Sequence, residues 1–296
     1  MIETIKRLKK ERNAIILAHN YQPPEILEIA DLKGDSLELS IKASETDKDV
    51  IVFCGVMFMA ETASILSPEK TVLLPKKDAG CPMADMVTAR GLEKTKKTLP
   101  NVPVVTYVNS SAEVKALSDI CCTSANVIKI VESIDSDEIL MVPDRNLAAY
   151  AASKTDKTIH IWDGFCPIHD RLTSDMVFIQ KKAHPGADFI AHPECRQEVL
   201  HLADAILSTS GMLAYPSKSD KKEFIIGTEN GLLYQLNKMY LDRKFYSASS
   251  DMMCPDMKKI TYEDIIESLT NMSGEIKVPE KTRKPALNAV RRMLEV

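Results

Sequence analysis

The sequence contains no long apolar run and carries little net charge. No stretch approaches the ~20 apolar residues that a transmembrane helix needs, so we expect no membrane partner. The first residues, MIETIKRLKKERN, predict a charged amphipathic helix and lack the apolar segment of a secretory signal. A formal net charge of −4 over 296 residues gives no indication of nucleic-acid binding. We therefore expect a cytosolic (cytoplasmic) protein whose partners are small molecules.

Close cysteine pairs are also missing. The chain has seven cysteines but no C-x2-C pair and no C-x3-C-x2-C motif. An odd number of cysteines in a cytosolic chain favours free thiols, metal ligands or nucleophiles over a disulfide framework. Structural zinc usually takes four ligands, often in close pairs, and no fourth ligand repeats along this chain. Neither a typical structural zinc site nor a radical-type cluster motif is expected.

The sequence does contain a repeated Cys-Pro pattern. Cys81, Cys166 and Cys254 are each followed by proline, and the three segments read CPMADMVT, CPIHDRLT and CPDMKKIT. The cysteines lie 85 and 88 residues apart, a period that indicates a repeated structural unit. A lone cytosolic cysteine is usually a small buried hydrophobic residue. Three in register instead predict thiols that meet on a pseudo-threefold axis and hold a metal or an iron–sulfur cluster with one open position.

Short apolar runs alternate with helical stretches through each repeat. The first runs are NAIILAHNYQ, VPVVTYVNSS and ADFIAHPECR, in register with the cysteines. Such alternation predicts parallel βαβ units. The predicted fold class is α/β, with three pseudo-threefold-related lobes, each a small parallel β-sheet sandwiched by helices, and an active site at the central junction. We place the lobes at 1–84, 85–170 and 171–256, and expect a helical C-terminal extension, 257–296, to pack back near the first lobe.

Each lobe has three predicted strands. The second strands lie in VIVFCGVMFMAETAS, LSDICCTSANVIKIV and LADAILSTSGMLAYP, and the third in TVLLP, EILMVPD and EFIIGTEN. The segment EILEIADLKGDSLELSIKAS between the first two strands of the first lobe predicts a helix. The threonine that closes each Cys-Pro segment predicts a helix N-cap, because its hydroxyl can accept a free N–H of the first turn.

Polar residues end the predicted strands. Ligands bind at the carboxyl ends of parallel strands, so we expect these residues to meet in a central cavity. Helices that begin near Ser124 and Thr209 would direct free N–H groups into it and so favour an anionic ligand. His169 stays ambiguous, and Cys54, Cys121, Cys122 and Cys195 are predicted to be core residues. The predicted cavity residues are His19, Asn20, Tyr21, Tyr107, Asn109, Ser124, His192, Glu194, Ser208 and Thr209.

The chain resembles the quinolinate synthase family of bacteria and archaea over nearly its whole length. The segments that carry the resemblance are AHNYQ (18–22), GDS (34–36), GCPMAD (80–85), YVNSS (107–111), CTSAN (122–126), GFCPIH (164–169), HPEC (192–195), STSGM (208–212), GTENG (227–231) and MCPDMKK (253–259). The resemblance implies condensation of iminoaspartate with dihydroxyacetone phosphate to quinolinate, phosphate and water, within NAD biosynthesis. It also implies a functional link to the aspartate-oxidising enzyme that supplies iminoaspartate.

The resemblance implies a role for each matching residue. Cys81, Cys166 and Cys254 would hold a [4Fe–4S] cluster with one open iron. Glu194 would be the acid/base residue and Tyr21 a catalytic hydroxyl that closes the site, with His19, Tyr107 and His192 also catalytic. The implied substrate-binding residues are His19, Ser36, Tyr107, Asn109, Ser124, His192, Glu194, Ser208 and Thr209, of which Ser208 and Thr209 would take phosphate or carboxylate.

Two other functions compete with this interpretation. A diphthamide-type radical enzyme would share the architecture and the one cysteine per lobe, and would cleave S-adenosylmethionine at the open iron. The HNYQ, YVN and HPE segments argue against it. A non-enzymatic iron–sulfur sensor would need a macromolecular partner, and the chain shows no DNA-binding motif or basic face to support one.

Overall fold

The computed structural model describes residues 1–296 and contains three four-stranded parallel sheets. Their strand orders are β2-β1-β3-β4, β6-β5-β7-β8 and β10-β9-β11-β12, so all three sheets share one topology. The strands are β1 (Ala14–His19), β2 (Leu32–Gly34), β3 (Val50–Cys54), β4 (Thr71–Leu73), β5 (Val104–Tyr107), β6 (Ile120–Cys122), β7 (Glu138–Val142), β8 (Thr158–Ile161), β9 (Asp188–Ala191), β10 (Ala205–Ile206), β11 (Glu223–Gly227) and β12 (Lys244–Ser247).

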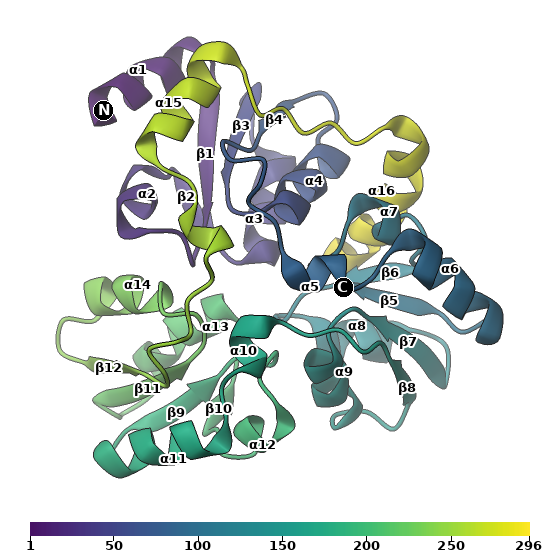
Figure 1. Ribbon diagram of the computed structural model, residues 1–296, viewed down its shortest axis with the longest axis vertical. Coiled ribbons are helices and arrows are strands. Elements are labelled where there is room, and N and C mark those ends of the chain that lie inside the picture. The colour runs from purple at the N-terminus through teal and green to yellow at the C-terminus, as the bar shows by residue number, and fades with distance from the viewer.

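Helices connect the strands and flank each sheet, and the three lobes surround a central junction (Figure 1). The predicted α/β class with three pseudo-threefold-related lobes is confirmed. The helices are α1 (Ile2–Glu11), α2 (Pro24–Ile29), α3 (Ser36–Glu45), α4 (Met57–Leu66), α5 (Pro82–Asp85), α6 (Ala89–Thr98), α7 (Ala112–Lys115), α8 (Val127–Ser133), α9 (Arg145–Ala152), α10 (Pro167–Asp170), α11 (Ser174–Ala183), α12 (Gln197–Leu200), α13 (Thr209–Ala214), η1 (Tyr215–Lys218), α14 (Leu232–Met239), η2 (Asp256–Lys258), α15 (Tyr262–Asn271) and α16 (Glu280–Glu295).

One polar contact recurs in all three lobes and supports the repeat. An aspartate just before the second strand accepts a hydrogen bond from a backbone N–H of the first strand, at 2.7–2.8 Å. The carboxylate thereby satisfies a strand donor that would otherwise have no partner. The three pairs are Asp31 with Ile16, Asp119 with Val104, and Asp204 with Phe189.

The threonine that closes each Cys-Pro segment begins a helix, as the sequence predicts. The Thr88, Thr173 and Thr261 hydroxyls accept backbone N–H groups of α6, α11 and α15, at 3.1, 3.4 and 3.3 Å. Only Thr261 has a full capping box, because Asp264 also accepts the backbone N–H of Thr261. The aliphatic residue before each threonine is buried and anchors the turn between the cysteine and the helix.

The number of strands per lobe differs from the prediction. The structure has four strands in each lobe, and β2, β8 and β12 were missed. All three are edge strands with mixed exposure, so they lack the continuous apolar run that marks a buried strand. The predicted helix over EILEIADLKGDSLELSIKAS is wrong, because this segment divides into α2, β2 and α3. As a result, VIVFC of the first lobe is its third strand and matches β7 and β11.

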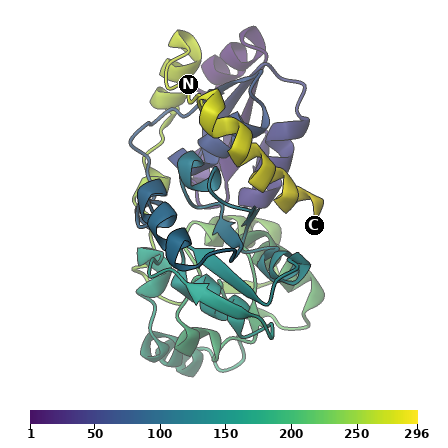
Figure 2. The same ribbon diagram turned by 90° about the vertical axis from the view of Figure 1, so that its right-hand side faces the viewer.

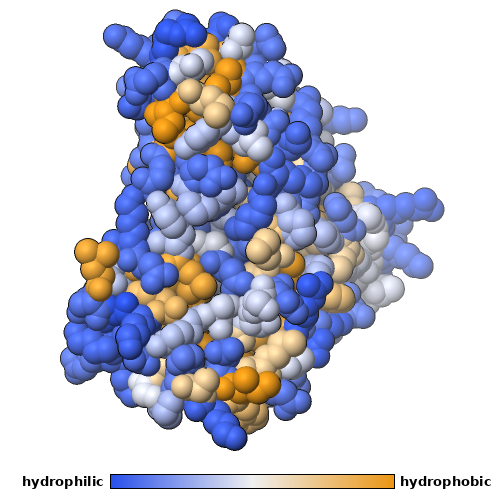
Figure 3. All heavy atoms as spheres, turned by 60° about the vertical axis from the view of Figure 1, so that its left-hand side comes forward, coloured by the Kyte–Doolittle hydropathy of each residue, from blue (hydrophilic) through white to orange (hydrophobic).

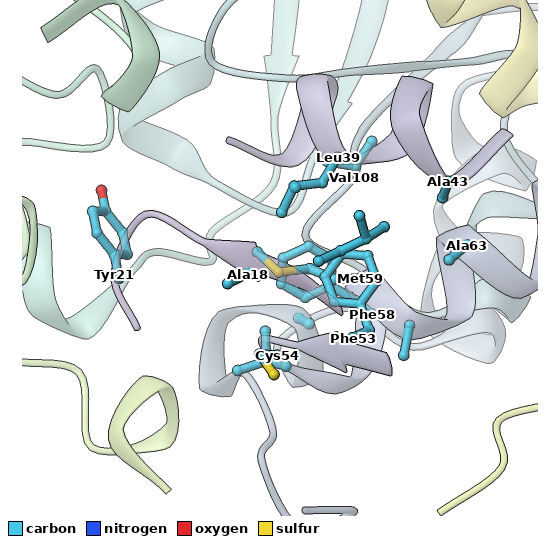
Figure 4. Packing of buried hydrophobic residues seen from close by; sticks show 14 of the residues in the cluster. Ala18, Tyr21, Leu39, Ala43, Phe53, Cys54, Phe58, Met59, Ala63 and Val108 are labelled. Carbon is cyan, nitrogen blue, oxygen red and sulfur yellow. The ribbon is translucent and has the colours of Figure 1, made fainter. Parts of the chain in front are cut away.

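The first lobe is packed between its sheet and the helices α3 and α4. All five residues of β3 are buried, and Leu39 of α3 and Phe58 and Met59 of α4 cover the sheet (Figure 4). Tyr21, in the loop after β1, lies apart from this packed group in the same view. The packed core therefore holds the ends of the strands in place, whereas the loop after β1 lies apart from this packed group and can contribute Tyr21 to the cavity.

The C-terminal segment crosses between lobes. Helix α15 packs on α1, and the Arg12 guanidinium donates to the carbonyl oxygens of Leu269 and Thr270. Helix α16 packs on α4 of the first lobe and on α7 and β6 of the second, and it runs along the side of the molecule in Figure 2. Boundaries at 84/85, 170/171 and 256/257 stay our proposal for the lobes, since the tail contacts more than one of them.

The surface is mixed in character. Polar residues predominate on the face shown in Figure 3, where apolar residues form separate small areas. Leu241, at 91% exposure, is the most exposed of the large apolar side chains. None of the helices combines the length and the apolar character required to span a bilayer.

Candidate functional site

A cavity of about 110 Å³ lies where the three lobes meet. Residues from the carboxyl ends of strands in all three lobes line it, as expected for parallel sheets. Every site residue proposed from the sequence lines this cavity except Ser208 and Asn20. The proposed residues that line it are His19, Tyr21, Ser36, Cys81, Tyr107, Asn109, Ser124, Cys166, His192, Glu194, Thr209 and Cys254.

The two exceptions support residues that do line the cavity. Ser208 is the N-cap of α13 and accepts the backbone N–H of Gly211, at 3.3 Å. The side-chain amide of Asn20 donates to the Thr209 hydroxyl, at 3.0 Å. Both are therefore placed one layer behind the wall, where they hold Thr209 in position.

The ends of the first strands of the three lobes contribute residues at equivalent positions of the cavity wall. His19, Tyr107 and His192 occupy the same place at the ends of β1 and β5 and just after β9. Two residues further on, the three lobes carry different groups. These are the phenol of Tyr21, the amide of Asn109 and the carboxylate of Glu194.

Each of the three cysteines stands at the start of a short helical turn. Cys81 and Cys166 are the N-caps of α5 and α10, and Cys254 comes just before η2. Backbone N–H groups of these turns approach all three sulfur atoms and favour the thiolate. The proline after each cysteine suits the first position of a helix, where no N–H partner is needed.

Two acidic side chains accept hydrogen bonds from the backbone of the cysteine segments. The Cys166 N–H donates to Asp144, and the Cys254 N–H donates to Glu229, both at 3.1 Å. Asp144 and Glu229 occupy equivalent places after β7 and β11, where the first lobe has Val56. Sequence reasoning missed both as site residues, although each lies at the end of a segment that was predicted to hold the third strand, EILMVPD or EFIIGTEN.

Glu194 is the centre of a buried polar network. Its carboxylate accepts from the Tyr107 hydroxyl at 2.6 Å and lies 2.7 Å from Nδ1 of His169. Burial alone would raise the pKa of Glu194, but the positive charge of the His169 and His192 imidazoles in their protonated form, together with these hydrogen bonds, holds it well below its usual range. Glu194 is therefore a buried, ionised carboxylate in the cavity wall.

His19 and His192 are neutral at physiological pH. Burial lowers the pKa of both imidazoles to about 3, and at His19 the charge of a protonated His192 ring and that of Lys258 act in the same direction. His192 stacks on His169 with 4.7 Å between ring centroids, and its Nε2 lies 3.2 Å from the Ser124 hydroxyl. A neutral imidazole has one donor and one acceptor nitrogen, so these rings can both orient a ligand and relay a proton.

His169, which the sequence left ambiguous, belongs to the site. Its Nδ1 lies 3.2 Å from the Cys166 sulfur as well as 2.7 Å from Glu194, and its Nε2 lies 2.9 Å from the Thr228 hydroxyl. Its equivalents after the other two cysteines are Ala84 and Met257, so no repeat pattern could have found it.

Comparison with known proteins decides the family. The family profile described as quinolinate synthetase A protein matches residues 3–295. The chain belongs to the quinolinate synthase family. The quinolinate synthase of Geobacter sp. strain M21 is 57% identical over 99% of this chain and 96% of its own length. The quinolinate synthase of Geotalea uraniireducens is 58% identical over the same shares, and quinolinate synthase 2 of Methanosarcina acetivorans is 54% identical over 99% and 95%.

The quinolinate synthase segments of the sequence build the cavity. Each of the segments that carry the resemblance contributes at least one lining residue. Only Val56, Phe58 and Met59 of the lining come from elsewhere, and they supply an apolar part of the wall. The family resemblance and the cavity therefore concern the same residues.

The three cysteines fit a metal cluster by their chemistry. Burial raises the pKa of Cys81 to about 12, and it also raises the pKa of Cys166 and Cys254. Three neighbouring thiols in such surroundings lose their protons only when a cation compensates the charge. A second possible arrangement for a single ion shares one of them, because ligand atoms of Cys166, His169 and Glu194 lie within 4.8 Å of one another.

Proposed function

We propose that the protein is a quinolinate synthase that condenses iminoaspartate with dihydroxyacetone phosphate. One molecule of each gives quinolinate, one phosphate and two water molecules, so the reaction needs no oxidant or reductant. The observation that carries the proposal is the meeting of one cysteine from each lobe with Glu194 and Tyr21 on a single cavity wall. The family membership of the whole chain supports the same reaction.

The proposed cofactor is a [4Fe–4S] cluster held by Cys81, Cys166 and Cys254. Four thiolates normally hold such a cluster, so three leave one iron open. When bound, the cluster would supply a Lewis acid that polarises a substrate oxygen. The N–H groups of α5, α10 and η2 would stabilise the negative thiolates.

Four hydroxyl and amide groups of the cavity wall are suited to the anionic parts of the substrates. Ser36 is the first residue of α3, and Thr209 is the first residue of α13. With Ser124 and Asn109 they offer donors to carboxylate or phosphate without a charged side chain. Ser208 contributes by holding the first turn of α13 in place. This choice of donors lets an acidic protein bind anionic substrates.

Condensation and ring closure require protons to move at carbon and oxygen, and Glu194 is placed to accept them. It is ionised, buried and already hydrogen-bonded to Tyr107. Burial raises the pKa of Tyr21 and Tyr107 far above the usual value, so both phenols keep their protons and can act as hydrogen-bond donors. The neutral imidazoles of His19 and His192 can hold or pass a proton beside them.

The imine substrate is labile in water, so the reaction benefits from an enclosed cavity. Tyr21 comes from a loop of the first lobe and is 8% exposed, which supports its role in closing the site. The proposal also includes a cytosolic location and a supply of iminoaspartate by an aspartate-oxidising enzyme. Seven free cysteines support the reducing compartment.

The cofactor proposal can be tested by changing one cysteine at a time. Anaerobically purified protein should contain iron and sulfide in equal numbers, absorb as a brown cluster, and form quinolinate from the two substrates. Cys81→Ser and Cys254→Ser should each abolish the cluster and the activity, as should Cys166→Ser. A single ion at Cys166, His169 and Glu194 would instead survive the changes at Cys81 and Cys254, and that result would contradict the cluster.

The acid/base role has a separate test. Glu194→Gln keeps the shape of the side chain and both of its hydrogen-bonding partners within reach, but it removes the charge. We expect the variant to retain the absorbance and iron content of the cluster and to lose quinolinate formation by at least about a hundredfold. A near-normal rate would show that another group is the base.

A further inference from the structure

Helix α14 carries a buried glutamine that is linked to the cavity wall through one intermediate residue. The Gln235 amide nitrogen lies 3.0 Å from Oδ1 of Asn20, and the Asn20 amide nitrogen lies 3.0 Å from the Thr209 hydroxyl. All three side chains are buried, and of the three only Thr209 lines the cavity. We propose that Gln235 is a positioning residue that acts through Asn20 and directs the hydroxyl proton of Thr209 toward an anionic group of a substrate. This inference rests on the proposed function, in which Thr209 binds such a group.

The direction of these hydrogen bonds follows from a backbone carbonyl group. The Gln235 amide nitrogen also lies 3.4 Å from the Asn20 carbonyl oxygen, which can only accept. The part of the Gln235 amide that faces Asn20 is therefore its NH2 group and not its oxygen. Asn20 must then present its own side-chain oxygen to Gln235, which leaves its NH2 group to donate to Thr209. The opposite orientation of the Asn20 side chain would place two NH2 groups against each other.

The Thr209 hydroxyl keeps its own proton free for a ligand. A hydroxyl has one proton to donate, and here its oxygen accepts from the Asn20 amide. Asn20 is its only hydrogen-bonding partner within the protein. Because Thr209 lines the cavity and its proton has no acceptor in the protein, that proton is available there. A carboxylate or phosphate oxygen would accept it in a charge-assisted hydrogen bond, which is stronger than a neutral one.

The repeated fold supplies the hydroxyl but not the amide that orients it. Strand register aligns the threonine with Ser36 and Ser124, so each lobe presents a hydroxyl at this place in the cavity wall. The places equivalent to Asn20 hold Val108 and Pro193, neither of which has a hydrogen-bonding side chain. All three lobes nevertheless form the same sheet. The Asn20 amide is therefore not needed for the fold, and it connects a loop of the first lobe to two helices of the third.

The test combines steady-state kinetics with a double-mutant cycle in the cluster-containing enzyme. Gln235→Leu and, as a second variant, Gln235→Met remove the amide at similar volume, and Thr209→Val removes the hydroxyl itself. Each should raise the KM of one of the two substrates about tenfold, the lower limit expected for one hydrogen bond to a charged group, with little change in kcat. A rise for dihydroxyacetone phosphate would assign phosphate to Thr209, and a rise for iminoaspartate would assign a carboxylate. Because Gln235 acts through Thr209, Gln235→Leu should cause no further loss when it is added to Thr209→Val.

A control variant lies on the same helix. Asn237 is exposed, and its amide donates to the Leu233 carbonyl oxygen at 2.8 Å, so Asn237→Leu should leave kcat and both KM values unchanged. Cluster absorbance and the midpoint of urea unfolding should show that each variant is folded and loaded. Wild-type KM values in both Gln235 variants would overturn the inference, as would a double variant in which the two losses add. Absence of quinolinate formation by the wild type would instead refute the proposed function itself.

Discussion

The buried neutral histidines make a sharp prediction about acid stability. His19 and His192 have pKa values of about 3 in the folded protein, against an ordinary value of about 6.5 in an unfolded chain. Below pH ~6.5 the unfolded state therefore binds protons that the folded state does not. The free energy of unfolding must fall as the pH falls, and it must regain its full value above pH ~6.5.

The size of the effect follows from linkage. Between about pH 7.5 and about pH 5.5, each imidazole contributes a loss of about 1.4 kcal/mol, so the pair contributes about 2.7 kcal/mol. Other groups act in the opposite direction. Burial raises the pKa of Asp35 and Asp144, so these carboxyls take up protons in the folded state first and offset part of the loss. The pH dependence of the free energy of unfolding of the whole protein is thus less informative than the part of it that a single histidine contributes.

Urea unfolding of anaerobic protein at the two pH values isolates that slope. His192→Asn should change stability at both pH values but reduce its pH-dependent loss by about 1.4 kcal/mol, and His19→Asn should do the same. His201→Asn, on the surface, is the control and should keep the wild-type pH dependence. Parallel stability curves for wild type and the two buried variants would show that the imidazoles bind protons equally well in the folded and the unfolded protein, and would contradict neutral histidines in the site.

Three further predictions concern the scaffold and can be read from urea midpoints. Thr261→Ala removes the hydroxyl of the capping box and should cost about 1 kcal/mol; no change would mean that the cap is redundant. Gly274→Ala should cost about 2 kcal/mol or more, because φ is +85° and a Cβ would lie 2.4 Å from a carbonyl oxygen, whereas Gly186→Ala has open space and should be nearly neutral. Glu61→Gln removes the carboxylate whose charge favours the protonated form of the fully buried Lys115, and it should cost about 3 kcal/mol. Lys115→Met in the same protein should restore much of that loss, and an additive double variant would refute the electrostatic coupling.

The sequence predicted best what the three lobes share. The cysteine period, the threonine caps and the first-strand ends recur at fixed spacing, so one pattern supports the next. The edge strands β2, β8 and β12 were missed because their exposed residues carry no continuous apolar signal, as the segment Leu32–Gly34 shows. The carboxylates of Asp144 and Glu229 could have been found, because both follow the third strand of their lobe. His169 and Thr228 could not, since their contacts join segments 59 residues apart and no equivalent residue repeats them.

The proposed chemistry depends on positions at which the three repeats differ. A strictly threefold cavity would present three copies of one side chain, and three identical groups cannot divide acid from base. Two residues after the equivalent ends of the first strands, the lobes instead supply Tyr21, Asn109 and Glu194. These are a donor phenol, a neutral amide and an ionised carboxylate. Three equivalent cysteines can bind one inorganic group only if the three lobes keep the same fold. Proton transfer instead requires that the lobes carry different acidic and basic side chains. The positions that break the repeat are therefore where we expect changes in activity without changes in fold.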